Sequence, residues 1–221
     1  YEVREVAGIE GWEADTETVQ TVQVTAGSTV TVTMTNKAQA GLRILKYSRT
    51  DRQYLSDVSF EVYRDGVSLG IFKTDAQGEI FLPNCASGTY LCIERNVSGH
   101  VLDTTPQQVE LKAGDGIKTL VFYNDRLPGI HLIKVDSADP SKTIPNARFR
   151  IEAVDGSYGP KEFVTSDAGV IDLSGLPVGA YKVTELECAG YVIDNAERII
   201  QLDGGEQAQF IFTNSVLPTL C

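Results

Sequence analysis

The chain has 221 residues and a mass of 24.0 kDa, a length that suits one or two ordinary domains or three small ones. Its formal charge of −11 and isoelectric point near 4.6 disfavour nucleic-acid binding, because an acidic surface repels phosphates. The 42% of hydrophobic residues is enough for packed cores, while no apolar run approaches the ~20 residues of a membrane span. No basic and then apolar leader begins at Tyr1, so we expect any signal peptide to lie outside this stretch.

Short segments rich in Val, Ile, Thr, Phe and Tyr, separated by Gly, Asp, Asn and Pro, predict β-strands throughout, and no stretch has a helical period with caps. In chain order the segments that match between the two halves are Gly41–Ser48, Asp57–Gly66, Thr74–Leu82, Ser87–Glu94 and Thr119–Asn124, followed by Gly129–Asp136, Asn146–Gly156, Thr165–Leu173, Val178–Glu185 and Ala208–Asn214. The second five repeat the first five with a period near 90 residues. The sequence therefore predicts two all-β sandwiches in tandem.

The first forty residues match only the second half of this repeat. Tyr1–Glu5 corresponds to the strands that end at Glu94 and Glu185, and Thr31–Asn36 corresponds to the last strand. The separation between this Glu and the closing Asn is 31, 30 and 29 residues in the three copies. We therefore expect the chain to be a segment of a longer tandem array.

The predicted boundaries follow from this alignment. We expect a half-repeat over residues 1–40, complete repeats over 41–126 and 127–216, and a linker or the start of a further repeat over 217–221. The joints at Lys37–Ala40 and Asp125–Pro128 are very short, which predicts a stiff rod rather than a flexible string of domains.

Each complete repeat places one Lys, one Glu and one Asn on strand faces that should be buried. Side chains alternate between the two faces of a strand, so Lys134 shares its face with Leu132, and Asn214 shares its face with Phe212. The two sets are Lys46, Glu94 and Asn124 in one repeat and Lys134, Glu185 and Asn214 in the next. An isolated buried charge is unfavourable, so we expect the three side chains of each set to meet.

Two outcomes are open for such a set. The simpler one is a buried Lys–Glu ion pair with Asn as a hydrogen-bond partner. In the other, burial lowers the pKa of the Lys and raises that of the Glu, so that a neutral amine attacks the Asn carboxamide and the Glu moves protons to the departing ammonia. The product is a Lys–Asn isopeptide bond between the first and the last strand. The half-repeat holds only Glu5 and Asn36, so its Lys would have to come from residues before Tyr1.

The ordered set of motifs resembles the Cna B-type (SpaA-like) repeats of Gram-positive surface adhesins and pilins. The features that carry the resemblance are the ILKYS and LIKVD strands with Lys46 and Lys134, the TDAQG and TSDAG turns, the Glu94 and Glu185 strands, and the last strands that end at Asn124 and Asn214. The resemblance covers essentially the whole chain. It implies tandem Ig-like or prealbumin-like β-sandwiches in a rod-like array, crosslinked by isopeptide bonds.

The function expected from the residues and the resemblance is structural. We expect stalk modules of a bacterial surface adhesin or pilus-like fibre, extracellular and anchored to the cell wall through a region outside this segment. The expected partners are neighbouring repeats of the same chain and, through other parts, fibre subunits or a host surface ligand. The crosslinking is a single turnover on the protein itself, so we expect neither an enzyme nor a cofactor.

Two alternatives remain. A host-protein or glycan-binding β-sandwich module is possible, but the sequence shows no exposed aromatic cluster to support it. A hydrolase is disfavoured because His100 and His131 are the only histidines and no nucleophile elbow is present.

Several further residues have simpler expected roles. Cys85 and Cys92 are interpreted as small buried hydrophobic residues, with a disulfide between them as the alternative, and Cys188 and Cys221 have no obvious partner. Both histidines are expected on the solvated surface, and Trp12 in packing. Asp75 and Asp167 supply too few oxygens to predict a metal site, and Asp15, Asp103 and Asp194 are expected to cap turns.

Overall fold

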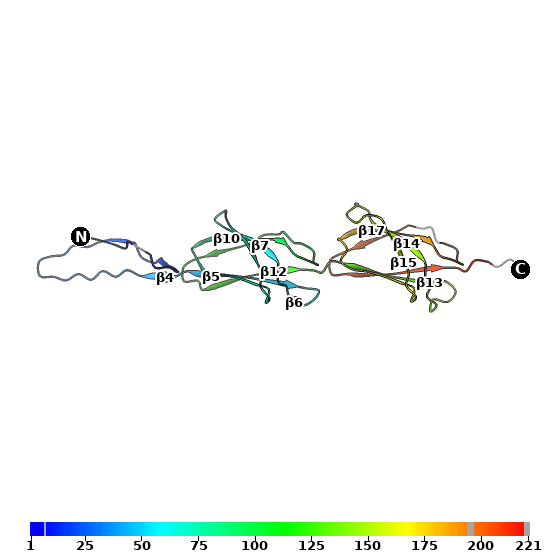
Figure 1. Cartoon of the computed structure of the whole chain (residues 1–221). Coiled ribbons are helices and arrows are strands. Elements are labelled where there is room, and N and C mark those ends of the chain that lie inside the picture. The colour runs from blue at the N-terminus through cyan, green and yellow to red at the C-terminus, as the bar shows by residue number, and fades with distance from the viewer. Residues whose placement is uncertain (7, 194–196, 219–221) are drawn as a thin grey trace. The chain divides into compact units, whose positions relative to one another are not determined.

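The computed structural model describes residues 1–6, 8–193 and 197–218, and within these ranges the chain consists of strands and loops without a helix (Figure 1). No helix that could cross a membrane occurs in these ranges. The chain divides into two compact units. One contains residues 1–47, 52–98 and 102–123, and the other contains 48–51, 99–101 and 124–221.

The first forty residues form two small two-stranded sheets. The strands are β1 (Glu2–Arg4), β2 (Trp12–Ala14), β3 (Val19–Thr21) and β4 (Asn36–Ala38), with β1 paired to β3 and β2 paired to β4. The predicted strand over Thr31–Asn36 is wrong, since regular pairing begins only at Asn36. In a complete repeat this last strand pairs with the Lys-bearing first strand, and residues 1–40 contain no such strand to pair with.

Residues 1–40 also do not bury the apolar strand faces that the sequence predicts for them. Tyr1 is 82% exposed and Trp12 is 46% exposed, so neither side chain lies in a core. The reason is that two two-stranded sheets cannot enclose an interior, which needs three or more strands with a hydrophobic face. The half-repeat therefore has the local pattern of the fold without its core.

Residues from Ala40 to Asn124 form the first β-sandwich. Its strands are β5 (Ala40–Ser48), β6 (Gln53–Tyr54), β7 (Ser59–Arg64), β8 (Val67–Lys73), β9 (Glu79–Cys85), β10 (Gly88–Asn96), β11 (Gln107–Leu111) and β12 (Ile117–Asn124). One sheet has the order β11-β10-β7-β8, and the other has the order β12-β5-β6, with β9 paired to β5. The core combines side chains from both sheets, such as Ile44 of β5 with Phe60 of β7.

Residues from Gly129 to Asn214 form the second β-sandwich. Its strands are β13 (Gly129–Asp136), β14 (Arg148–Ala153), β15 (Lys161–Val164), β16 (Val170–Leu173), β17 (Gly179–Glu187), β18 (Arg198–Leu202) and β19 (Gln207–Asn214). One sheet has the order β16-β13-β19 and the other β15-β14-β17-β18. Leu132 of β13, Phe149 of β14 and Phe212 of β19 lie in its core. The predicted pair of all-β sandwiches is therefore confirmed.

A glycine turn fixes the backbone of the lysine strand in each sandwich. Gly78 has φ +71°, and a Cβ added there would lie 2.7 Å from Tyr54 Cβ and 3.0 Å from the Lys46 carbonyl oxygen. Gly169 has φ +74° and meets Thr143 Cβ and the Lys134 carbonyl at the same two distances. Only glycine combines this left-handed φ with so close an approach to backbone. These turns let the Lys46 and Lys134 amides donate to the Gly78 and Gly169 carbonyls.

Candidate crosslinking site

Lys134 is a fully buried lysine in the middle of an apolar strand. Its strand β13 reads GIHLIKVD, and Ile130, Leu132 and Lys134 all point to the core face with 0% exposure. The alternation of a strand therefore forces the amine inward, because a shift of one residue would expose Ile130 and Leu132. A charge buried in this way must find a polar partner.

Asn214 reaches the same interior from the neighbouring strand. Strands β13 and β19 run parallel, with Lys134 opposite Phe212 and Asp136 opposite Asn214. Lys134 and Asn214 are thus two positions apart along adjacent strands and lie on the same face, a separation that a long lysine side chain can span. Lys134 Nζ also donates to the Phe212 carbonyl at 3.3 Å.

Glu185 approaches from the opposite sheet. It lies on β17 and is 2% exposed. Its Oε1 accepts a hydrogen bond of 2.7 Å from Asn214 Nδ2 and lies 3.7 Å from Lys134 Nζ. One carboxylate oxygen therefore accepts a hydrogen bond from the carboxamide and lies within ion-pair distance of the amine.

Burial shifts the Lys134 side chain toward its neutral form. Burial lowers the pKa of Lys134, and the nearby carboxylate of Glu185 offsets only part of this shift. Phe212 and Phe149 pack edge to face beside the site, with ring centroids 5.0 Å apart. Burial also raises the pKa of the neighbouring Cys188, so this thiol stays protonated. A neutral amine is a nucleophile, whereas an ammonium is not.

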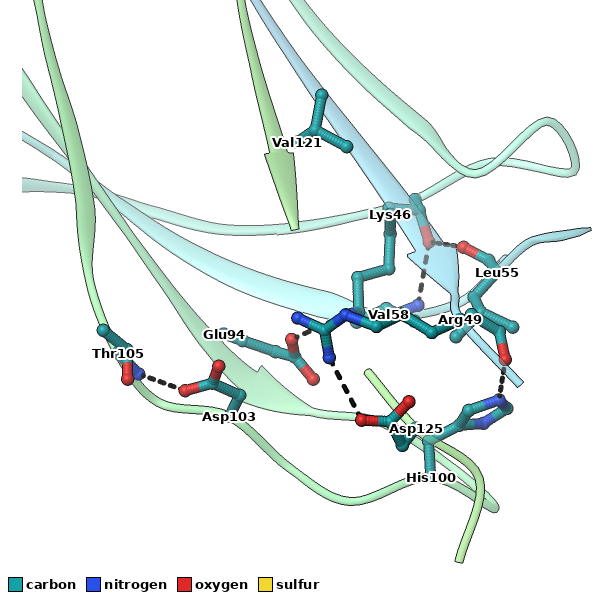
Figure 2. Close-up of polar contacts among 12 residues, drawn as sticks. Lys46, Arg49, Leu55, Val58, Glu94, His100, Asp103, Thr105, Val121 and Asp125 are labelled. Atoms are coloured by element: carbon teal, nitrogen blue, oxygen red, sulfur yellow. Dashed lines mark hydrogen bonds and ion pairs between the residues drawn. The ribbon is translucent and has the colours of Figure 1, made fainter. Parts of the chain in front are cut away.

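The first sandwich contains the corresponding lysine and glutamate. Lys46 and Glu94 are both 0% exposed, and Lys46 Nζ lies 3.2 Å from Glu94 Oε2. Figure 2 shows the Lys46 side chain directed toward Glu94. Asn124 is buried at the end of β12, the strand that neighbours β5 of Lys46 in the sheet order. The first sandwich thus repeats the elements that carry the set in the second.

In the half-repeat the glutamate and the asparagine of the set lie close together. Asn36 Nδ2 donates to Glu5 Oε1 at 3.2 Å, and both residues are only partly buried. Lys37, the only lysine of residues 1–40, lies beside Asp15 instead. The glutamate and asparagine of the pattern therefore meet here without the amine.

The structure also decides the simpler roles predicted from sequence. Cys85 and Cys92 are buried and free, which confirms their role as small core residues, and Cys188 is buried and free as well. Asp103 accepts from the Thr105 amide, which confirms a turn cap. Cys221 and Asp194 lie outside the described residues.

The expectation of two solvated histidines is wrong for His100. Its side chain is 10% exposed, and Nε2 lies 3.0 Å from both Asp51 Oδ2 and Ser48 Oγ. Hydrogen bonds to these polar partners replace the hydrogen bonds to water that the imidazole loses on burial. His131 is more exposed and lies beside Asp172.

Three tyrosines contradict the expectation that the sequence holds no exposed aromatic cluster. Tyr47, Tyr54 and Tyr123 meet on the outer face of the first sandwich. They are separated by up to 76 positions in the sequence, so a scan for neighbouring aromatic residues misses them. The available signal was that Tyr47 and Tyr123 directly neighbour inward-facing positions and must therefore face outward.

The chain is thus a tandem pair of β-sandwiches, each with a buried lysine beside a glutamate. The profile of the SpaA family, described as a prealbumin-like fold domain, matches residues 40–126 and 128–215. The chain belongs to this family, which confirms the prealbumin-like type of sandwich expected from the sequence.

The chain is similar to several solved structures. The Bacillus anthracis TIE protein is 27% identical with a TM-score of 0.43, and the match covers 81% of this chain and 34% of that protein. A mutant of the shaft pilin SpaA from Lactobacillus rhamnosus GG is 14% identical with a TM-score of 0.50, covering 83% of this chain and 100% of the pilin. The Streptococcal ancillary pilin is 20% identical with a TM-score of 0.43, covering 99% and 75% of the two chains. No curated protein sequence matches the chain.

Proposed function

We propose that this chain is a structural part of a bacterial surface adhesin or pilus-like fibre, whose complete repeats are crosslinked by Lys46–Asn124 and Lys134–Asn214 isopeptide bonds. The observation that carries the proposal is the buried contact of Glu185 with both Lys134 and Asn214, on the first and last strands of one sandwich. The membership of the SpaA family and the pilins among the similar structures support the fibre role.

The proposed reaction is balanced without an external reagent. The neutral Nζ of Lys134 attacks Cγ of Asn214, the Nζ–Cγ bond forms, and the Cγ–Nδ2 bond breaks. Glu185 takes a proton from the attacking nitrogen and delivers it to Nδ2, which leaves as ammonia. Glu94 has the same role toward Lys46 and Asn124. Each site reacts once and on its own chain, so the protein is not an enzyme in the usual sense.

The proposed domain organisation follows the sequence pattern. Residues 1–40 are the second half of a repeat, 41–126 and 127–216 are complete repeats, and 217–221, of which 219–221 lie outside the described residues, begin a connection. The short joints are proposed to make a stiff stalk. The half-repeat uses Glu5 and Asn36 with a lysine supplied from outside residues 1–40.

The proposed location is the bacterial cell surface, with anchoring to the cell wall by another region. The match covers 34% of the TIE protein, so the activity and partners of a whole protein of that kind are themselves part of the proposal. Neighbouring repeats, other fibre subunits and a host ligand are the proposed partners.

The crosslink gives the stalk its mechanical role. Force enters a sandwich through its terminal strands, whose ladder hydrogen bonds contribute only about 1 kcal/mol each. A covalent bond between the first and last strands carries the load in their place. We expect each complete repeat to show almost no extension before the tether breaks, and Lys46→Ala to restore an unfolding step in that repeat alone.

Two measurements test this proposal. The intact mass should fall short of the sequence mass by two molecules of ammonia, one for each complete repeat. Single-molecule pulling should show no unfolding step for residues 41–216. A mass equal to that of the unmodified chain would overturn the crosslinks, and full stepwise unfolding of the wild-type chain would overturn the stalk role.

A further inference from the structure

Three tyrosines from three neighbouring strands form a cavity on the outer face of the first sandwich. Tyr123 lies on β12, Tyr47 on β5 and Tyr54 on β6, which are adjacent in the sheet order β12-β5-β6. The ring of Tyr47 lies 5.4 Å from that of Tyr54 and 5.9 Å from that of Tyr123, at interplanar angles of 77° and 78°. With Leu45 and Val121 these rings line a cavity of about 200 Å³.

This cavity is separate from the buried crosslinking set. Strand alternation places Lys46 and Phe122 in the core and their neighbours Tyr47 and Tyr123 on the opposite face. Figure 2 shows Val121 of the cavity lying apart from the Lys46 and Glu94 pair. Tyr54 is 53% exposed and Tyr123 is 42% exposed, so solvent reaches the cavity.

The second sandwich shows that the fold does not need these aromatic rings. The Leu55 amide donates to the Lys46 carbonyl, and the Ile144 amide donates to the Lys134 carbonyl, so Tyr54 corresponds to Thr143. By the same alignment Tyr47 corresponds to Val135 and Tyr123 to Thr213. A sandwich of the same architecture thus forms with none of the three tyrosines. Because the fold does not require the three tyrosines, their presence in the first sandwich has another reason. Clustered exposed aromatic rings mark binding surfaces.

The chemistry of the lining selects a neutral ligand. None of the five lining side chains carries a charge. Residues 41–126 contain ten Lys and Arg against eleven Asp and Glu, so this repeat is nearly neutral although the whole chain has a charge of −11. Tyrosine offers an apolar ring face together with a hydroxyl group, which suits a ligand that has both apolar C–H faces and hydroxyl groups.

We propose that the cavity of Tyr47, Tyr54 and Tyr123 binds one ring of a neutral sugar. Pockets for drug-sized ligands measure roughly 300–1,000 Å³, so a cavity of about 200 Å³ takes a smaller ligand such as one pyranose ring. A proline-rich peptide is the less suitable occupant, because it docks in an extended groove along several residues rather than in one compact cavity. The site is independent of the crosslinking reaction.

The test uses the whole chain and small probes. Saturation-transfer NMR is recorded with methyl glycosides of neutral hexoses and N-acetylhexosamines, and separately with a decaproline peptide. We expect at least one glycoside to bind with a Kd of order 1 mM, as suits a ligand of so few atoms. Saturation transfer from no glycoside, or from decaproline alone, overturns the proposal.

Variants that copy the second sandwich make the test specific. Tyr54→Thr and Tyr123→Thr introduce the residues found at the matching positions 143 and 213, and each should weaken glycoside binding roughly tenfold, which corresponds to about 1.4 kcal/mol. Thr143→Ala is the matched control and should leave binding unchanged. An unaltered thermal transition shows that the variants fold.

The remaining outcomes contradict the proposal. Equal binding by the tyrosine variants and the wild type would place the sugar elsewhere. The wild type could also bind no glycoside but self-associate in sedimentation experiments, with the association abolished in Tyr54→Thr. This result would mean that a second copy of the chain covers the cavity.

Discussion

Replacing Glu185 with Gln separates the packing of the buried set from its chemistry. The Gln side chain has the same length and can still contact Asn214 and Lys134, whose atoms lie 2.7 and 3.7 Å from the present carboxylate oxygen. A carboxamide does not exchange protons near neutral pH, so the amine cannot transfer its proton to the leaving ammonia. We expect the second sandwich to fold in this variant and to remain without its crosslink.

The stability loss can be estimated from the length of the closed loop. Lys134 and Asn214 are 80 positions apart. In the chain-entropy relation for a covalent link, a loop of this length contributes about 4.5 kcal/mol by restricting the unfolded chain. For a domain of this size each kcal/mol shifts Tm by about 4–8 °C, so Glu185→Gln should lower the transition of this sandwich by about 18–36 °C. Removing the negative partner of the buried Lys134 adds to the loss.

Mass spectrometry and calorimetry check the prediction together. The variant should be heavier than the crosslinked wild type by about one ammonia after allowing for the substitution, and the extra mass should map to peptides that hold Lys134 and Asn214. Glu187→Gln, at an exposed position on the same strand, is the control and should keep the bond. If Glu185→Gln still loses ammonia to the wild-type extent, the proton-transfer role is wrong. If it loses the bond with no fall in Tm, the loop-closure estimate is wrong.

Three further outcomes follow from the structure. Glu94→Gln should prevent the release of ammonia in the first sandwich only, as peptide mapping would show. If the crosslink were missing from both sandwiches, the two sites would be coupled. The variant Asn214→Ala cannot crosslink, and in it the lowered pKa of folded Lys134 means that the unfolded chain binds more protons than the folded chain. Its free energy of unfolding should therefore rise as pH increases toward 10.5, compared with the double variant Asn214→Ala with Lys134→Met. A fall in this free energy would contradict burial of the amine. Burial raises the pKa of Cys92 to about 12 and also raises the pKa of Cys85. Neither thiol should therefore be alkylated by iodoacetamide at pH 8 until the chain unfolds. Rapid labelling of the native protein would show instead that the core opens.

The sequence alone determined which side chains of the first and last strands of each sandwich point inward. In GIHLIKVD and QAQFIFTN the alternation of apolar residues fixes the face of Lys134 and Asn214, because a strand has a period of two. The repeat of this pattern also gave the number of sandwiches and the tandem order. The strands Val67–Lys73 and Arg198–Leu202, which lie at sheet edges, were not predicted.

Only the tertiary structure decided the direction in which the strands pair and the sheet to which each strand belongs. No local pattern shows that β13 and β19 run parallel side by side, or that Glu185 crosses from the other sheet, because strand pairing depends on contacts between residues far apart in the chain. For the same reason Thr31–Asn36 has the composition of a strand and yet lacks regular pairing, since composition does not supply a partner strand. The cavity of Tyr47, Tyr54 and Tyr123 likewise exists only because β12, β5 and β6 are neighbours in one sheet.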